Sequence, residues 1–271
     1  MVLLMPNLSH TIRRFNRFEL KYLITLQQAE QIKTALRAYL SPDEHSDNRG
    51  SYTLASLYYD SPDYHCFWEK MDGIKFRRKL RIRHYETAAQ PADESSVSAG
   101  CTLSADSPVF VEIKQRYDRV TQKRRARLPY GEALRLCNER QIPEHAPEDK
   151  AVINEILAYQ WEYNLRPTSL VRYSRQALVG SEYDIGLRVT FDTALSYQTN
   201  TLSLHDQSTN LPLFPADCVV MEIKVNERIP YWLTELVAAH NFSLVRVSKY
   251  CRSIELSQNI PSARWQMALA V

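Results

Sequence analysis

Two short segments of the chain show the same alternation of apolar and charged residues. Residues 219–224 read VVMEIK, and residues 109–114 read VFVEIK. Successive side chains of an extended strand point to opposite faces, so the Glu and the Lys of each segment share one face. The pattern therefore predicts two strands, each with an apolar face that packs on a core and a second face that carries charge.

Similar patterns along the chain predict further strands, separated by helices. Thr25 and Gln28 have the spacing of a capping box at the start of a helix. Residues 87–107 are rich in Ala, Ser, Pro and Asp without periodicity, and we expect a flexible insertion at a hairpin tip. The predicted strands span 17–23, 52–60, 75–83, 108–117, 120–128, 168–178, 183–193 and 217–226, and the predicted helices span 26–40, 130–141, 148–163, 230–240 and 248–256.

The strongest single pattern lies in residues 75–83. The alternating positions of this segment are all basic: Lys75, Arg77, Lys79, Arg81 and Arg83. On an isolated surface strand such a row would simply face water, where an ion pair contributes about 0–1 kcal/mol. That explanation weakens because charged rows recur on other predicted strands. The further members of these rows are Arg17, Glu19, Lys21, Glu112, Lys114, Arg172, Arg188, Glu222 and Lys224.

The order of the elements favours antiparallel pairing, because most predicted strands are neighbours in the sequence. Eight strands suffice to close a barrel whose interior holds side chains or one small ligand. The helices at 26–40, 130–163 and 230–241 would cover the apolar outer faces. We therefore expect an α+β fold, a closed antiparallel eight-stranded β-barrel with helices packed outside, rather than an open sheet. The chain, 1–271, is expected to be a single domain with its core at about 13–256.

Composition excludes several classes of function. The chain has 6 Gly and no G-x-G-x-x-G or Walker-type run, so a Rossmann or P-loop nucleotide site is not expected. The net charge of +3 and the acidic partners within the basic rows argue against nucleic-acid binding. Five scattered Cys without a C-x-x-C pair favour reduced thiols in a cytoplasm. The apolar run 1–5 is too short for a membrane span.

Charged rows inside a barrel call for a compensating ligand. An isolated charge in a dry interior costs on the order of tens of kcal/mol, so the enclosed cluster would be hydrated and built around a counter-ion. The excess of basic side chains predicts that this counter-ion is a polyanion. Glu19, Glu112 and Glu222 lie on separate strands and have the oxygen ligands that hold a hard divalent cation against phosphate oxygens. The pattern predicts a wet tunnel for metal and polyphosphate.

Seven short motifs occur in an order that resembles a known family. They read FELKY at 18–22, SLYYD at 56–60, KLRIRHY at 79–85, FVEIK at 110–114, RVTFD at 188–192, MEIK at 221–224 and VSKY at 247–250. Together they resemble the VTC domain, the catalytic domain of the eukaryotic vacuolar transporter chaperone polyphosphate polymerase. That domain belongs to the triphosphate tunnel metalloenzymes, and the resemblance extends over about 13–256.

The resemblance, together with the charged rows, implies roles for individual residues. The expected catalytic residues, which would align phosphates and neutralise charge, are Lys21, Arg81, Arg83, Arg172 and Lys224. The expected additional phosphate-binding residues are Lys79, Lys114, Lys123, Arg188 and Lys249. The expected ligands of Mn²⁺ or Mg²⁺ are Glu222, Glu112 and Glu19. Many tunnel enzymes begin with Glu-x-Glu-x-Lys, whereas Arg17 stands at the first Glu position here, which favours the polymerase branch.

The resulting hypothesis is a polyphosphate polymerase that transfers the γ-phosphoryl group of ATP to a growing polyphosphate chain and releases ADP. Two alternatives stay open: a tripolyphosphatase or nucleoside triphosphatase of the same fold, and a non-catalytic polyphosphate or inositol-phosphate binding module. The expected partners are ATP and inorganic polyphosphate, with no nucleic acid and no membrane span in this chain.

Overall fold

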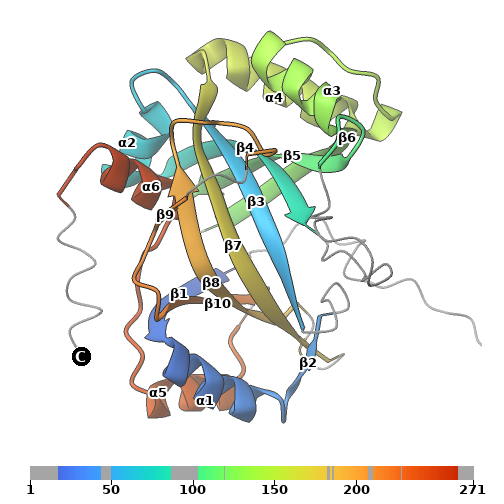
Figure 1. The fold of residues 1–271 in the computed structure, drawn as a ribbon. Coiled ribbons are helices and arrows are strands. Elements are labelled where there is room, and N and C mark those ends of the chain that lie inside the picture. Colours follow the sequence, from blue (N-terminus) through green and yellow to red (C-terminus); the bar gives the residue numbers. More distant parts are fainter. Residues whose placement is uncertain are drawn as a thin grey trace, which may run out of the picture.

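The computed structural model describes residues 18–43, 50–86, 103–118, 120–181, 184, 186–206, 210–226 and 228–261. Arg17 and most of the expected insertion, residues 87–102, lie outside the described residues. The strands are β1 (Phe18–Thr25), β2 (Leu40–Pro42), β3 (Ser51–Asp60), β4 (Phe76–Glu86), β5 (Pro108–Tyr117), β6 (Val120–Pro129), β7 (Arg166–Gly180), β8 (Arg188–Gln198), β9 (Leu211–Pro212) and β10 (Cys218–Val225) (Figure 1).

Helices follow several of these strands directly. The predicted capping box is present at the first helix: Thr25 Oγ1 accepts from Gln28 N at 3.2 Å, and Gln28 Oε1 accepts from Thr25 N at 2.9 Å. The helices are α1 (Leu26–Leu36), α2 (His65–Met71), α3 (Tyr130–Leu134), α4 (Lys150–Tyr163), α5 (Tyr231–Ala239) and α6 (Lys249–Ser257), with a π-helical turn η2 (Arg135–Glu139) and a 3₁₀ turn η3 (Pro147–Asp149). None of the helices within the described ranges has the length and hydrophobicity to cross a membrane.

All strands belong to one antiparallel sheet. Its main path runs β1-β10-β8-β7-β3-β4-β5-β6, with β2 beside β7 and β9 beside β8. The expected eight strands thus form the main path, but the sheet is not closed. Closure would require β6 to lie about 4.7–4.9 Å from β1, whereas among the described residues β1 forms its strand ladder with β10. The β5 side of the sheet reaches β1 through side chains, with Lys114 Nζ 3.0 Å from Glu19 Oε2.

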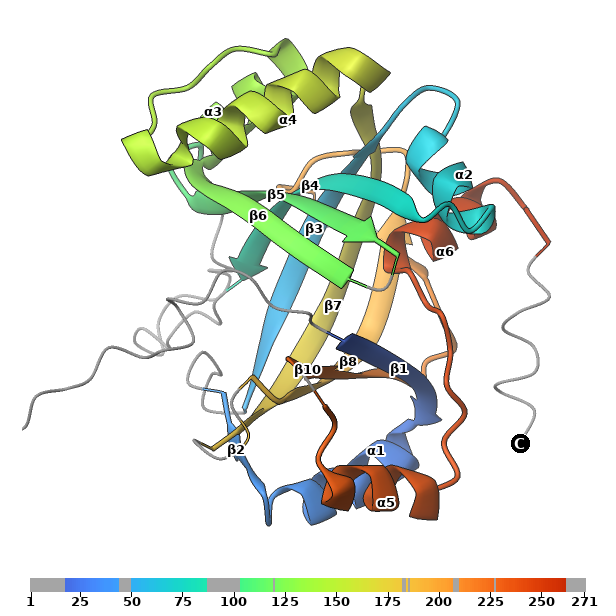
Figure 2. The same ribbon diagram turned by 180° about the vertical axis from the view of Figure 1, so that it is seen from behind.

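The apolar outer face of the sheet is covered at both ends (Figure 2). At one end α3 and α4 pack on the outer side chains of β3 to β6, which include Leu57, Leu80 and Val111. At the other end α1 and α5 pack on β1, β8 and β10, where Met221 is fully buried. A fully buried Leu, Met or Val side chain contributes about 1.5–3 kcal/mol. The helices therefore secure the outer face, and the charged rows lie on the other face.

The opposite face of the sheet is partly filled by α6. Tyr250 and Ile254 of this helix join Tyr58 and Tyr173 in a separate apolar cluster. Tyr250 Oη also bonds the carboxylate of Asp60, which is fully buried at the end of β3. We call this face the inner face; it carries the residues Glu19, Lys21, Arg81, Glu112, Asp192 and Glu222. α6 therefore brings its first residue, Lys249, next to the charged rows.

Several boundaries differ from the sequence-based prediction. The predicted strand 183–193 is found at 188–198. Gly186 turns the chain just before this strand with φ +84°, and a Cβ at this position would lie 1.9 Å from Asn226 Nδ2, so only glycine fits there. α1 ends at Leu36 rather than at residue 40, where β2 begins. The last part of the predicted insertion packs in the core, since Leu103 is 9% exposed. α2, β2 and β9 were not predicted.

Candidate functional site

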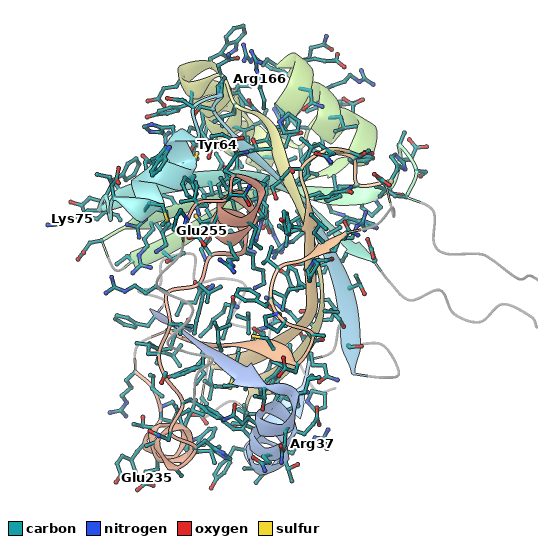
Figure 3. The ribbon with its side chains drawn as sticks, turned by 60° about the vertical axis from the view of Figure 1, so that its left-hand side comes forward. Arg37, Tyr64, Lys75, Arg166, Glu235 and Glu255 are labelled. Carbon is teal, nitrogen blue, oxygen red and sulfur yellow. The ribbon has the colours of Figure 1, made fainter. Side chains whose placement is uncertain are left out.

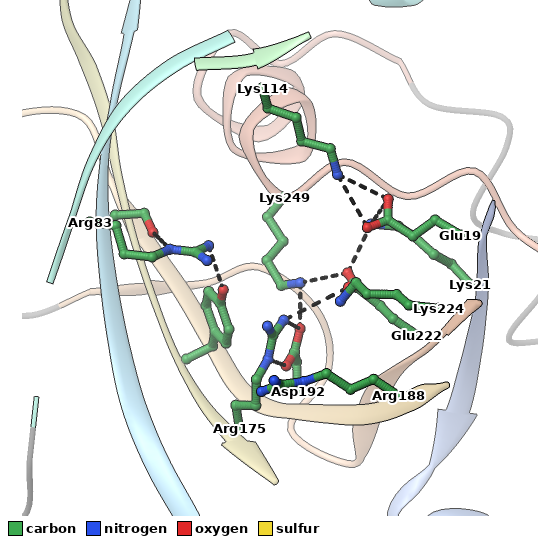
Figure 4. Close-up of polar contacts among 12 residues, drawn as sticks. Glu19, Lys21, Arg83, Lys114, Arg175, Arg188, Asp192, Glu222, Lys224 and Lys249 are labelled. Atoms are coloured by element: carbon green, nitrogen blue, oxygen red, sulfur yellow. Dashed lines mark hydrogen bonds and ion pairs between the residues drawn. The ribbon is translucent and has the colours of Figure 1, made fainter. Parts of the chain in front are cut away.

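The centre of the inner face is the carboxylate of Glu222 on β10. Lys21 on β1 lies 2.8 Å from it, and Lys224, two residues further along β10, lies 2.6 Å from it. Lys249 approaches to 3.3 Å from α6, and Arg175 to 3.8 Å from β7. Glu222 is 4% exposed. One buried carboxylate therefore faces four cationic side chains from four elements (Figure 4).

A second buried carboxylate, Asp192 of β8, shares two of these cations. It accepts two hydrogen bonds from Arg175, at 2.6 and 2.8 Å, in a bidentate arrangement. Lys249 Nζ lies 2.5 Å from its second oxygen. Asp192 is fully buried, and strand pairing places it directly opposite Arg175. Lys249 and Arg175 thus connect Asp192 with Glu222, and the four groups form one network.

A third carboxylate, Glu112 of β5, lies among cations of the neighbouring strands. Arg81 of β4 binds one oxygen at 2.6 and 2.9 Å, and Lys123 of β6 lies 3.3 Å from the other. Glu112 is fully buried. At the other end of the strand order, Glu19 of β1 accepts from Lys114 at 3.0 and 3.2 Å and lies 3.9 Å from Lys21.

Arg83 differs from the other buried cations of this face. It is 6% exposed, and its guanidinium donates to the hydroxyl groups of Ser56, at 3.3 Å, and Tyr173, at 3.0 Å. It forms no ion pair with a carboxylate in the described part of the chain. A buried charge without a direct ion pair is costly, so a ligand anion near Arg83 would add to the counter-charge that Glu112 supplies from a greater distance.

The network strongly shifts the ionisation of its members. Burial opposes ionisation of Glu222, but Lys21, Lys224 and Lys249 together hold its pKa well below the usual range. Burial lowers the pKa of Lys224 to about 7, despite the opposing effect of Glu222. Burial likewise lowers the pKa of Lys123 to about 8, although Glu112 opposes this. The carboxylates are therefore ionised at neutral pH, whereas these two lysines titrate near it.

The expected phosphate-binding residues at the edges of the network have other contacts. Lys79 Nζ lies 3.0 Å from Ser248 Oγ and 2.9 Å from Cys251 Sγ, and 5.1 Å from the centre of the Tyr250 ring. Arg188 pairs with Asp43 at 2.5 Å and donates to Tyr52 Oη at 2.9 Å. Both residues lie on the inner face but outside the group around Glu222.

Arg172 is an expected catalytic residue that the structure places away from the carboxylates of the inner face. It pairs with Glu86 and donates to the carbonyl oxygens of Leu204, at 2.7 Å, and Asp206, at 2.8 Å. The predicted strand 168–178 was assigned with Arg172 inward. In the structure the alternate row of β7 faces inward, and Arg175 takes that place. The signal for this choice was Asp192, the last residue of the RVTFD motif, whose carboxylate needed a basic partner.

The geometry does not fit a divalent cation held by the protein alone. Glu19, Glu112 and Glu222 are each occupied by lysine or arginine side chains. The described residues contain no group of three His, Cys, Asp or Glu side chains arranged to hold a metal ion. Hard cations in proteins require several oxygen ligands. The assignment of Glu222, Glu112 and Glu19 as metal ligands therefore stays a prediction, and in the structure each of the three pairs with lysine or arginine.

Comparisons with known proteins place the chain in a family. Among solved structures, a provisionally assigned adenylate cyclase from Bacillus halodurans matches at 12% identity with a TM-score of 0.49, covering 88% of this chain and 96% of that chain. A provisionally assigned adenylyl cyclase from Hippeastrum, described as having a dominant triphosphatase activity, matches at 11% identity with a TM-score of 0.47, covering 92% and 98%. No curated protein matches the sequence. The profile of the VTC domain matches residues 16–258, and the chain therefore belongs to the VTC domain family.

Proposed function

We propose that the chain is a polyphosphate polymerase that transfers the γ-phosphoryl group of ATP to the end of a polyphosphate chain and releases ADP. Membership of the VTC domain family supports a protein that acts on polyphosphate or triphosphate. The proposal includes a cytoplasmic location, which the scattered cysteines favour because their thiols are expected to be reduced.

The observation that carries the proposal is the surplus of cations on the inner face. Among the described residues the basic side chains there outnumber the carboxylates Glu19, Glu112, Asp192 and Glu222 that pair with them, and Arg83 forms no ion pair with a carboxylate. Partly buried cations interact strongly with anions because water screens them little. A linear anion with several charges matches cations that come from β1, β4, β5, β7, β10 and α6. Such an arrangement suits a chain of phosphates better than a single phosphate.

In the proposed reaction a terminal oxygen of polyphosphate attacks the γ-phosphorus of ATP. The bond between that phosphorus and the β,γ-bridging oxygen breaks, and its electron pair leaves with ADP. The nucleophile is already an anion, so no side chain has to remove a proton. Lys21, Lys249 and Arg175 would align the phosphates and neutralise charge that spreads over the transferring group. Arg81 and Arg83 would hold the adjoining phosphates.

The test is incubation of the purified protein with ATP and a divalent metal. Mn²⁺ or Mg²⁺ is supplied because the resemblance to the VTC domain implies a divalent metal. We expect one ADP to be released for each phosphoryl group added to polyphosphate. We also expect Lys21→Ala and Arg81→Ala to lower the rate by roughly a hundredfold or more, as loss of charge stabilisation does. Arg37→Gln, which removes an exposed charge on α1, serves as the control.

The products also separate the alternative functions. Release of inorganic phosphate without polymer would identify a triphosphatase and contradict the polymerase. Tight binding of polyphosphate without turnover of ATP would identify a binding module. If neither product forms and Lys21→Ala and Arg81→Ala leave phosphate binding unchanged, the inner face is not the site and the proposal fails.

A further inference from the structure

The basic row of β4 does not end at the buried network. Arg77 lies two residues before Lys79 and four before Arg81, on the same face of the strand. The pairing of β4 with β5 sets Lys79 opposite Lys114 and Arg77 opposite Arg116. Exposure rises along this path, because the Glu112 side chain is fully buried, that of Lys114 is 38% exposed and Arg116 is exposed. A continuous row of cations thus runs from the interior to solvent.

Two further cations extend this path at its outer end. Lys70 belongs to α2, and Arg246 precedes α6; Figure 2 shows both helices beside the end of the β4–β5 pair. Burial, with added repulsion from Lys79, Arg77 and Arg116, lowers the pKa of Lys70 to about 8. Arg116 and Arg246 act on Arg77 in the same direction. We call Lys70, Arg77, Arg116 and Arg246 the outer basic row.

No member of the outer basic row forms an ion pair with a carboxylate within the described ranges. Arg77 donates to the carbonyl oxygen of Ile74, and Arg116 donates to that of Asp118 at 2.8 Å. Arginines on the other face of the same sheet behave differently. Arg78 of β4 pairs with Glu162 at 2.8 Å, and Arg124 of β6 pairs with Glu155 at 2.5 Å. The arginines under α4 therefore have carboxylate partners at close range. Within the described ranges those at the outer end of the inner face have none, and Glu69 acts on Arg77 only at longer range.

This lack of compensation costs the free protein stability. Like charges directly opposite one another on paired strands are destabilising, and Arg77 and Arg116 are such a pair. A bound polyanion would remove the repulsion by placing negative charge between the two side chains. Arg77 lies about 13 Å along the strand from Arg81. Only an extended anion reaches from the buried network to the outer basic row, and a compact triphosphate does not.

We propose that the outer basic row is a docking surface for the part of a long polyphosphate chain that lies outside the buried site. The identity of this ligand rests on the proposed function, whereas the surface itself rests on the uncompensated cations. The row raises the affinity for long chains and has no effect on short ones. During elongation it holds the chain close to the buried network between successive transfers.

The test compares a double variant, Arg77→Gln/Arg116→Gln, with a matched control, Arg37→Gln/Arg166→Gln. Arg37 and Arg166 are exposed and form no ion pair in the described structure. Figure 3 shows both away from Lys75, which lies two residues before Arg77. Dissociation constants are measured for tripolyphosphate and for long-chain polyphosphate, without ATP, at several salt concentrations. Thermal unfolding checks that each variant is folded.

For the double variant we expect at least a tenfold loss of affinity for long-chain polyphosphate, with a smaller salt dependence because fewer counter-ions are released. Affinity for tripolyphosphate stays within about twofold, and the control variant keeps both affinities, as exposed charges elsewhere should. Equal losses in the control, or an unchanged affinity for long chains, would overturn the proposal. The proposal would also be overturned if the double variant lost binding to single-stranded DNA and kept its binding to polyphosphate, because this result would assign the surface to nucleic acid.

These binding measurements, together with the incubation with ATP described above, separate this proposal from the polymerase. If the protein forms no polymer from ATP but prefers long chains through Arg77 and Arg116, the docking surface stands and the polymerase fails. If the protein forms polymer and the double variant still binds long chains as tightly as the original, the polymerase stands and the docking surface fails.

Discussion

Replacement of Glu222 by Gln tests how the buried network works. The amide keeps the shape of the side chain and removes its charge. Lys21, Lys224, Lys249 and Arg175 then lose the carboxylate that lies within 2.6 to 3.8 Å of each of them. Lys249 and Arg175 retain Asp192. Lys21 and Lys224 suffer most, because among the described carboxylates Lys21 keeps only Glu19, at 3.9 Å, and Lys224 keeps none within 4.0 Å.

The expected loss of stability follows from burial. Removing one partner of a buried ion pair costs about 3–5 kcal/mol, because a charge stays buried without compensation. In a protein of this size 1 kcal/mol corresponds to about 2–4 °C in the melting temperature, so we expect Glu222→Gln to melt roughly 10 °C lower. Glu235 on α5 is exposed and forms no ion pair within the described ranges, so Glu235→Gln should change the melting temperature little.

Tripolyphosphate should reverse much of this effect. At one hundred times its dissociation constant a ligand stabilises the folded state by about 2.7 kcal/mol. Glu222 repels phosphate, so its removal should also tighten binding, and one concentration of tripolyphosphate should raise the melting temperature of the variant more than that of the original protein. Thermal unfolding and calorimetric titration, both in EDTA, measure the two quantities.

The result that refutes this reasoning is a variant that is as stable as the original protein, or one that binds tripolyphosphate more weakly in EDTA. The first result would mean that the four cations do not depend on Glu222. The second would mean that Glu222 assists anion binding, which is the behaviour of a metal ligand and not of a counter-charge.

Three further predictions use the same binding assay. Burial lowers the pKa of Lys224 to about 7 and that of Lys123 to about 8, so the affinity for tripolyphosphate should fall between about pH 6 and pH 9 as both lysines lose their charge. Over the same range the contribution of both lysines to folding stability should rise with pH, because the unfolded chain binds more protons than the folded one. A flat profile of affinity against pH, or a profile that Lys224→Met leaves unchanged, would contradict this. Arg175→Gln should weaken binding at least tenfold, whereas Arg172→Gln should lower stability by about 1–3 kcal/mol with binding intact, so equal binding losses would disprove the assignment of faces. EDTA should change the dissociation constant of tripolyphosphate less than about threefold, and a larger loss would reveal a resident metal.

The strands and their faces were predictable because an amphipathic strand has an unambiguous period. The row of Glu222 and Lys224 faces inward and that of Val219, Met221 and Ile223 outward, since α1 and α5 cover the latter. The short helix α2 has no comparable periodic pattern in the sequence. It begins after Tyr64, whose φ of 60° is unusual for a residue other than Gly and whose side chain makes no capping hydrogen bond. The Asp60 carboxylate caps the helix instead, because it accepts from the backbone N–H groups of Cys66 and Phe67. Sheet closure depends on long-range geometry that no local period records.

The site was predictable only as far as the faces were correctly assigned. Lys21 pairs with Glu222 and Arg81 pairs with Glu112 on the inner face, because each lies on the polar row of a clean alternation. β7 has arginines on both of its rows, so alternation alone could not choose between Arg172 and Arg175. The choice is made by Asp192, whose buried carboxylate needs a bidentate partner directly across the strand pair. Such a requirement becomes visible once the pairing of β7 with β8 is known.

The pairing of the cations also indicates where an entering phosphate gains most. Lys21, Lys249 and Arg175 already have carboxylate partners at 2.5 to 2.8 Å, so a phosphate there must compete with an existing ion pair. Arg83 has two hydroxyl groups and no carboxylate, although it is 6% exposed. A phosphate that reaches Arg83 therefore adds a charge-assisted hydrogen bond without breaking an ion pair. The carboxylates keep the empty network stable, and Arg83 is the buried position at which binding a phosphate has the lowest cost.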